Sequence, residues 1–432
     1  MTQFLRSADP DFAQRFEDLV QARRDQPADV QDAVRSIIDE VRARGDEALI
    51  ALTARFDHVH LENSGLAIPP EELEAAFDRL APDLKAALET AYRRIESHHR
   101  RHVPSNERYT DAIGAELGHR WTPIDSVGLY VPGGKASYPS SVLMNAVPAK
   151  VAGVPRIVMV APAPRGEVNP AVLAAAHLAG VTEVYRIGGA QAVAALAYGT
   201  ETIKPVAKIV GPGNAYVAEA KRRVFGTVGI DSIAGPSEVV IVADGKADPR
   251  WIAADLLAQA EHDEAAQSIL ITDSVAMAEA TASAVEQQLA SMPRGSIASK
   301  SWKDHGAILL VSDLGREAPP LVNALAPEHL ELSCAAAEDM LPQIRNAGAI
   351  FLGHYTPEAV GDYVAGSNHV LPTTRTARFS SGLGVLDFMK RTSLLKLTPE
   401  SLAALGEATM TLAETEGLYG HRLSVAIRLQ EA

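Results

Sequence analysis

Residues 126–199 read SVGLYVPGGKASYPSSVLMNAVPAKVAGVPRIVMVAPAPRGEVNPAVLAAAHLAGVTEVYRIGGAQAVAALAYG. Short runs rich in β-branched residues, such as VGLYV and RIVMVA, alternate here with alanine-rich runs that have helical spacing. This alternation is typical of strand–helix–strand units, in which successive strands lie parallel in one sheet. The stretch therefore predicts a first α/β module.

A second set of such runs follows further along the chain. Strands are predicted at EVVIVAD (238–244), SILIT (268–272), GAILLV (306–311) and GAIFLG (348–353), with a helix at PRWIAADLLAQAEHD (249–263). Residues 1–101 and the tail beyond Phe379 show the three- and four-residue spacing of helices. The sequence thus predicts an α/β fold with two Rossmann-like parallel-sheet modules and helical N-terminal and C-terminal extensions.

We expect four parts along the chain. Residues 1–22 form an N-terminal helical extension, and residues 382–432 form a helical tail. Residues 130–237 form an α/β domain of the nucleotide-binding type. The two segments that flank it, 23–129 and 238–381, together form one discontinuous main α/β domain.

The composition excludes several classes of protein. Forty lysines and arginines against 54 aspartates and glutamates give the 432 residues a formal charge of −14, which leaves no basic field for nucleic acid. The opening MTQFLRSADPDFAQRF has no apolar run of signal-peptide length, and no later run predicts a membrane span, so we expect a cytoplasmic protein. The single cysteine, Cys334, excludes an internal disulfide and a multi-cysteine zinc site.

Gln259 and His262 are the first candidates for chemistry. Three residues apart on one helix, their side chains lie on the same face, where a metal ion could bridge them. Gln259 also falls on the apolar stripe of that helix, so something polar should meet it there. Candidates for further ligands are Asp362 and His421, and the four supply the nitrogen and oxygen atoms that suit zinc. Spacing alone leaves open a buried amide beside a surface histidine.

The sequence APEHLEL (326–332) places Glu328 and His329 next to each other, directly after Pro327. The proline favours an extended Ala326 and predicts that a strand begins there. An acid and an imidazole at this point could divide the proton transfers of a reaction. The alternative from the residues alone is a solvated pair on the surface.

Three glycine-rich turns could let the backbone approach a nucleotide closely: VPGGKASYPSS (131–141), GPGNAYV (211–217) and AGPSE (234–238). None of them has the G-x-G-x-x-G signature, because GPGNAY lacks the third glycine, as GLGVLD (382–387) also does. The turns alone therefore favour ordinary α/β connections over an NAD site.

Taken together, several long segments closely resemble the histidinol dehydrogenase family, in the right order and over nearly the whole chain. They are YVPGGKASYPSSVLMNAVPAKVAGV (130–154), GPGNAYVAEAKR (211–222), DSIAGPSEVVIVAD (231–244), AQAEHD (258–263), APEHLEL (326–332), SNHVLPT (367–373) and EGLYGHR (416–422). The resemblance implies NAD-dependent oxidation of L-histidinol through L-histidinal to L-histidine, the last two steps of histidine biosynthesis, with one zinc ion per subunit.

The resemblance also implies roles for individual residues. The implied zinc ligands are Gln259, His262, Asp362 and His421, and the metal mainly holds the imidazole and amino nitrogens of the substrate. The implied substrate contacts are these four residues together with Ser237, His329, His369 and Glu416. NAD would lie along Tyr130, Gln191 and Asn214, in a nucleotide site without the glycine signature. The family is homodimeric with shared active sites, so the tail would act in the partner's site.

This chemistry gives the adjacent acid and imidazole separate tasks. Hydride removal from an alcohol requires a base for the hydroxyl proton, and His329 is suited to it because imidazole titrates near working pH. An aldehyde has no second hydride to give until water adds, and Glu328 could deprotonate that water. Alternative interpretations are a paralogous zinc- and NAD-dependent dehydrogenase of another small alcohol, a zinc hydrolase with a metal-bound water, and a binding protein without activity.

Overall fold

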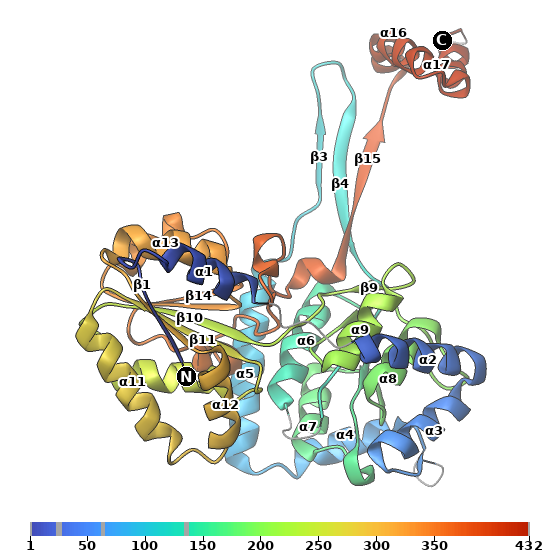
Figure 1. Cartoon of the computed structure of the whole chain (residues 1–432). Helices are drawn as coiled ribbons and strands as arrows, with labels where there is room; N and C mark the ends of the chain where they lie inside the picture. The colour runs from blue at the N-terminus through green and yellow to red at the C-terminus, as the bar shows by residue number, and fades with distance from the viewer. Residues whose placement is uncertain (1, 23–27, 62–64, 134–137, 431–432) are drawn as a thin grey trace.

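The computed structural model describes residues 2–22, 28–61, 65–133 and 138–430. Within these residues, two six-stranded sheets lie side by side, and a three-stranded arm projects away from both (Figure 1). Helix α5 (Pro82–Arg100) runs between the two halves in this view. The predicted α/β fold with two parallel-sheet modules is therefore confirmed.

The first sheet, here called the β10 sheet, is parallel throughout. Its strands in spatial order are β1 (Gln3–Arg6), β12 (Ala307–Leu310), β11 (Gln267–Thr272), β10 (Glu238–Ala243), β13 (His329–Ser333) and β14 (Ala349–Leu352). All residues of β10 and β13 are buried, as expected of parallel strands covered on both faces. One face packs on α1 (Phe12–Gln21), α13 (Leu314–Leu325) and α14 (Ala337–Met340). The other packs on α10 (Pro249–Ala260), α11 (Val275–Leu289) and α12 (Gly295–His305).

The second sheet, here called the β5 sheet, has one antiparallel edge. Its strands in spatial order are β2 (Ala67–Ile68), β7 (Glu183–Tyr185), β6 (Arg156–Val160), β5 (Ser126–Tyr130), β8 (Lys208–Val210) and β9 (Gly229–Ile230), and only the β2–β7 pair is antiparallel. One face packs on α5 and on α4 (Pro70–Asp78), α6 (Pro139–Ala152) and α7 (Pro170–Ala179). The other packs on α2 (Ala28–Arg44), α3 (Asp46–Asp57), α8 (Gly189–Tyr198) and α9 (Ala215–Val224).

The arm is an antiparallel sheet of β3 (Glu107–Thr110), β4 (Glu116–Pro123) and β15 (Met389–Lys396). It ends in two helices, α16 (Pro399–Thr415) and α17 (Tyr419–Gln430), which pack against each other away from both sheets (Figure 1). No helix among the described residues combines the length and the apolar character that crossing a membrane requires.

Strands also occur in the two predicted helical extensions and in the stretch 1–101 that has helical spacing. Residues 3–6 form β1 at the edge of the β10 sheet, residues 67–68 form β2, and residues 389–396 of the tail form β15. A half-buried strand is recognised in a sequence by apolar and polar residues that alternate, because every second side chain is buried. Only Leu5 is buried in β1, and no residue of β15 is buried, so neither strand carries that pattern.

The predicted domain boundaries stay a prediction, but the packing of each segment is plain. Strand β1 belongs to the β10 sheet, although residues 1–22 were predicted as a separate extension. Helices α2, α3 and α4, within the predicted segment 23–129, pack on the β5 sheet. The segments that pack on each sheet therefore differ from the segments of the predicted domains.

Candidate active site

His329 is the first residue of β13 and Glu328 directly precedes the strand; both are buried, with 3% and 6% of their surface exposed. The alternative of a solvated surface pair is therefore wrong, and the predicted strand start is confirmed. The predicted extended conformation of Ala326 is wrong, because this residue is left-handed, with φ 47° and ψ 58°. Its N–H bonds to the carbonyl of Val322 at 2.7 Å, so Ala326 ends helix α13 in the left-handed conformation common at helix C-termini.

Glu328 is held by the neighbouring strand. Its Oε2 accepts a hydrogen bond from the backbone N–H of Glu238, at 3.1 Å, and lies 3.8 Å from His329 Nδ1. Burial raises the pKa of Glu328 to about 7. A carboxyl group that titrates near neutral pH can exchange a proton with water or substrate under ordinary conditions.

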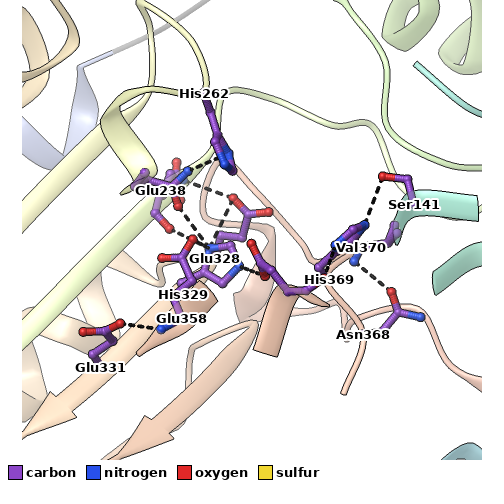
Figure 2. A network of polar contacts seen from close by, with 12 residues as sticks. Ser141, Glu238, His262, Glu328, His329, Glu331, Glu358, Asn368, His369 and Val370 are labelled. Carbon is purple, nitrogen blue, oxygen red and sulfur yellow. Dashed lines mark hydrogen bonds and ion pairs between the residues drawn. The ribbon is translucent and has the colours of Figure 1, made fainter. Parts of the chain in front are cut away.

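His329 is the centre of a polar network (Figure 2). Its Nδ1 lies 3.2 Å from Gln259 Oε1 and 3.3 Å from the carbonyl oxygen of Glu238, while its Nε2 lies 3.5 Å from Asp362 Oδ1. Burial lowers the pKa of His329, but the carboxylates of Glu358, Glu328 and Asp362 outweigh it and raise the pKa well above the ordinary value. The Nε2 atom of His329 is buried and has no hydrogen-bond partner among the described residues.

The two predicted ligands near residue 260 join this network. Gln259, on the last turn of α10, is fully buried, as its place on the apolar stripe predicted. Its Nε2 lies 3.3 Å from Nδ1 of His262, which is exposed in the turn just after the helix. The structure thus brings Gln259, His262 and Asp362 together around His329, which we call the His329 network.

A second histidine links the network to the other half of the molecule. His369 Nδ1 lies 2.9 Å from the carbonyl oxygen of Asp362, and its Nε2 lies 3.2 Å from the hydroxyl of Ser141 in the first turn of α6 (Figure 2). Helix α6 packs on the β5 sheet, whereas α15 (Glu358–Tyr363), which carries Asp362, contacts α10 of the β10 sheet, so the two contacts of His369 together connect the two halves. Ser141 was not among the predicted site residues, although it lies in one of the segments that carry the family resemblance.

Buried acids behind His329 were also missed. Glu358 Oε1 lies 3.6 Å from His329 Nδ1, and the N–H of Glu358, at the start of α15 (Glu358–Tyr363), bonds to Oε1 of Glu331 at 2.7 Å. Burial raises the pKa of Glu358 to about 8 and that of Asp255 to about 6. No signal like that of Gln259 was available, because polar and apolar residues alternate in the strand HLELS as in a half-exposed strand, although all five residues are buried. His329, Glu358 and Asp362 place ligand atoms within 4.8 Å of one another, a spacing that a metal ion could bridge.

The remaining predicted substrate contacts lie in two places, one beside the His329 network and the other on the arm. Ser237 is half-buried directly before β10, next to the residue that holds Glu328. Glu416 and His421 are exposed in the helical pair at the end of the arm, away from both sheets (Figure 1). A single chain therefore brings three of the four predicted zinc ligands together and leaves the fourth on the arm.

The predicted NAD contacts lie at or after the carboxyl ends of β5, β7 and β8, an edge where α/β sheets commonly bind nucleotides. Tyr130 ends β5, and its buried hydroxyl accepts a hydrogen bond from the N–H of Gly189 at 3.0 Å. Burial raises the pKa of Tyr130 to about 12, so the hydroxyl keeps its proton. Gln191 is buried in the first turn of α8, and Asn214 caps α9. Part of the first glycine-rich turn, residues 134–137, lies outside the described residues.

A family model, two similar relatives and a solved structure all point to the same family. The family model described as histidinol dehydrogenase matches residues 20–429. Histidinol dehydrogenases from Rhizobium meliloti and Brucella suis are each 63% identical, over 98% of this chain and 97% of the relative in the first case, and 99% and 100% in the second. The crystal structure of histidinol dehydrogenase from Elizabethkingia anophelis superposes with a TM-score of 0.94 at 34% identity, covering 100% of this chain and 98% of that one. This chain belongs to the histidinol dehydrogenase family.

Proposed function

We propose that the His329 network is the site at which this chain, as an NAD-dependent histidinol dehydrogenase, oxidises L-histidinol through L-histidinal to L-histidine. The observation that carries the proposal is the buried pair of Glu328 and His329, joined by contacts of 3.2 to 3.5 Å to Gln259 and Asp362. The alcohol step needs a base, and we assign it to His329. The aldehyde step also needs an activated water, and we assign its deprotonation to Glu328.

The donor atoms around His329 fit a zinc ion. Gln259 offers an amide oxygen, His262 an imidazole nitrogen and Asp362 a carboxylate oxygen, a set that zinc accepts in catalytic sites. We propose that these three and a tail histidine, His421, hold the metal. His329, which also lies in the group of possible ligands, is then left to act as a base. Bound there, zinc would hold the imidazole and amino nitrogens of the substrate and add positive charge beside His329.

Metal removal and product counting test this assignment together. We expect the zinc-loaded protein to form two NADH for each L-histidine, since each oxidation transfers one hydride to NAD. A chelator should abolish turnover and zinc should restore it, while the circular dichroism spectrum of the stripped protein stays native. One NADH per product, or full activity in protein shown by metal analysis to be zinc-free, would contradict the assignment.

We further propose that the active sites are shared within a homodimer. Glu416 and His421 are carried on the arm, and the same helices expose large apolar side chains, among them Leu412 at 64% and Tyr419 at 68%. Apolar surface of this kind on a projecting element is suited to contact with a second copy. Each tail would then supply its histidine and glutamate to the network of the other subunit.

Mixed dimers test the shared site. His421→Asn and His329→Asn subunits, each inactive alone, should regain about a quarter of wild-type activity when unfolded and refolded together, because half of the dimers are mixed and each mixed dimer has one intact site. The matched control mixes Asp362→Asn with His329→Asn, two changes in the same network, and should regain nothing. Equal recovery in both mixtures, or in neither, would count against tail exchange.

A further inference from the structure

The turn that follows β8 lies against the end of β5. Gly211 has a φ of +110°, and a Cβ atom on it would lie 2.2 Å from the carbonyl oxygen of Tyr130. No other residue type fits this backbone position without displacing one of the two strands. Three residues later Asn214 caps α9, with its Oδ1 accepting from the N–H groups of Tyr216 and Val217 at 3.0 and 3.2 Å. The turn 211–214 therefore sets where Asn214 lies relative to Tyr130.

A buried ion pair holds this turn from behind. The side chains of Lys221, on α9, and Asp231, just after β9, are 2% and 5% exposed and form a salt bridge. Lys221 Nζ donates to the carbonyl oxygen of Gly211 at 2.9 Å, and Asp231 Oδ2 accepts from the N–H of Gly211 at 2.7 Å. Both polar groups of one glycine are thus bound by the two members of the pair.

Stability alone gives little reason for this arrangement. Taking two charges out of water costs free energy that their attraction often only balances, and apolar side chains of similar size usually stabilise a core as well or better. The charged pair instead fixes the orientation of the Gly211 backbone, because one member binds its carbonyl oxygen and the other its N–H. The pair is also separate from the His329 network, since within the described part of the chain the two side chains bond to each other and to Gly211.

We propose that Lys221 and Asp231 are positioning residues for NAD. By holding Gly211 against Tyr130, they fix the distance between the two strand ends along which the cofactor lies, and they orient Asn214 at the start of α9. The inference rests on the proposed function, because Tyr130, Gln191 and Asn214 are assigned to NAD there. It predicts that loss of the ion pair lowers the affinity for NAD and leaves the affinity for L-histidinol unchanged.

The test compares two double variants of the zinc-loaded full-length protein. Lys221→Met with Asp231→Asn removes both charges without leaving one buried alone, and keeps an oxygen for the Gly211 N–H. The control, Arg156→Gln with Glu183→Gln, removes a bidentate ion pair with contacts of 2.7 and 2.9 Å on the same sheet, away from the turn. KM for NAD, KM for L-histidinol, kcat and the unfolding midpoint are measured for each.

We expect the KM for NAD, and its Kd in a titration without substrate, to rise about tenfold in the first variant, the effect of losing one charge-assisted contact. The KM for L-histidinol should stay within about twofold of wild type, as should both KM values in the control. An unchanged KM and Kd for NAD in folded Lys221→Met/Asp231→Asn protein would overturn the inference, as would equal rises in both KM values.

Two further measurements separate failure of this inference from misfolding and from failure of the proposed function. If the double variant does not fold, Asp231→Glu alone is measured, because it keeps both charges but moves the acceptor oxygen relative to the Gly211 N–H, and the same selective rise in the KM for NAD is expected. Failure of the proposed function shows separately, as wild-type protein that forms no NADH from L-histidinol. Wild-type protein that turns over normally, beside a variant with wild-type affinity for NAD, refutes only the positioning role.

Discussion

His329→Asn is expected to lower kcat for both oxidation steps by about a thousandfold, the usual contribution of a positioned general base. Each step removes a hydride from a carbon whose hydroxyl must lose its proton, so one base serves both. His329 is placed for this task by the strand register, which sets it opposite Val239 of β10, and by Gln259 at 3.2 Å from its Nδ1. Asparagine cannot take a proton at neutral pH, although it is polar and fits the space.

The measurement needs both steps separately. Formation of NADH is followed in single-turnover experiments started with L-histidinol and, in a second series, with L-histidinal. The matched control is His354→Asn, because His354 is a histidine just beyond the neighbouring strand β14, with its Nδ1 3.2 Å from the Ser333 hydroxyl and no place in the network. It should keep kcat within about twofold of wild type. An alcohol step of normal rate in His329→Asn would remove this residue as the base.

Much of the fold and part of the site could be predicted from local pattern. The central strands of both sheets, such as β5 and β10, are buried on two faces and appear as apolar runs, which is the strongest signal that a parallel sheet gives. Gln259 was found because an amide interrupted an apolar stripe, and the structure has it fully buried with a polar partner on each side. Such arguments work where the environment of a residue is set by its own helix or strand.

The convergence of the site could not be read in this way. Residues 259, 329 and 362 meet because α10 runs back along the β10 sheet and ends beside the first residues of β10 and β13, which are neighbours in the sheet. That neighbourhood depends on strand order, which spacing along the chain does not specify. The same limit hid Ser141, which His369 connects to Asp362 on a helix of the other half. The family resemblance supplied this set of residues where spacing could not.

Glu328→Gln is expected to separate the two reactions. Oxidation of L-histidinol to L-histidinal needs no added water, so its rate should stay within a few-fold of wild type, while oxidation of L-histidinal should fall by about a hundredfold. The glutamine side chain has the size of the glutamate and keeps an oxygen that can accept from the Glu238 N–H, now 3.1 Å away. What it loses is the carboxyl group whose pKa burial raises to about 7, near the pH at which the water must give up its proton.

The control for this variant is Glu331→Gln, which places the same amide on the same buried strand, where its oxygen can still accept from the N–H of Glu358. Because Glu331 has no assigned proton transfer, any loss there should affect both steps alike. The comparison therefore isolates the role of Glu328 from the general effect of replacing a buried glutamate by an amide in this part of the β10 sheet. Equal losses in the two steps for Glu328→Gln would mean that its carboxylate acts on His329 rather than on water. We would then assign the activation of the water in the second oxidation to His329.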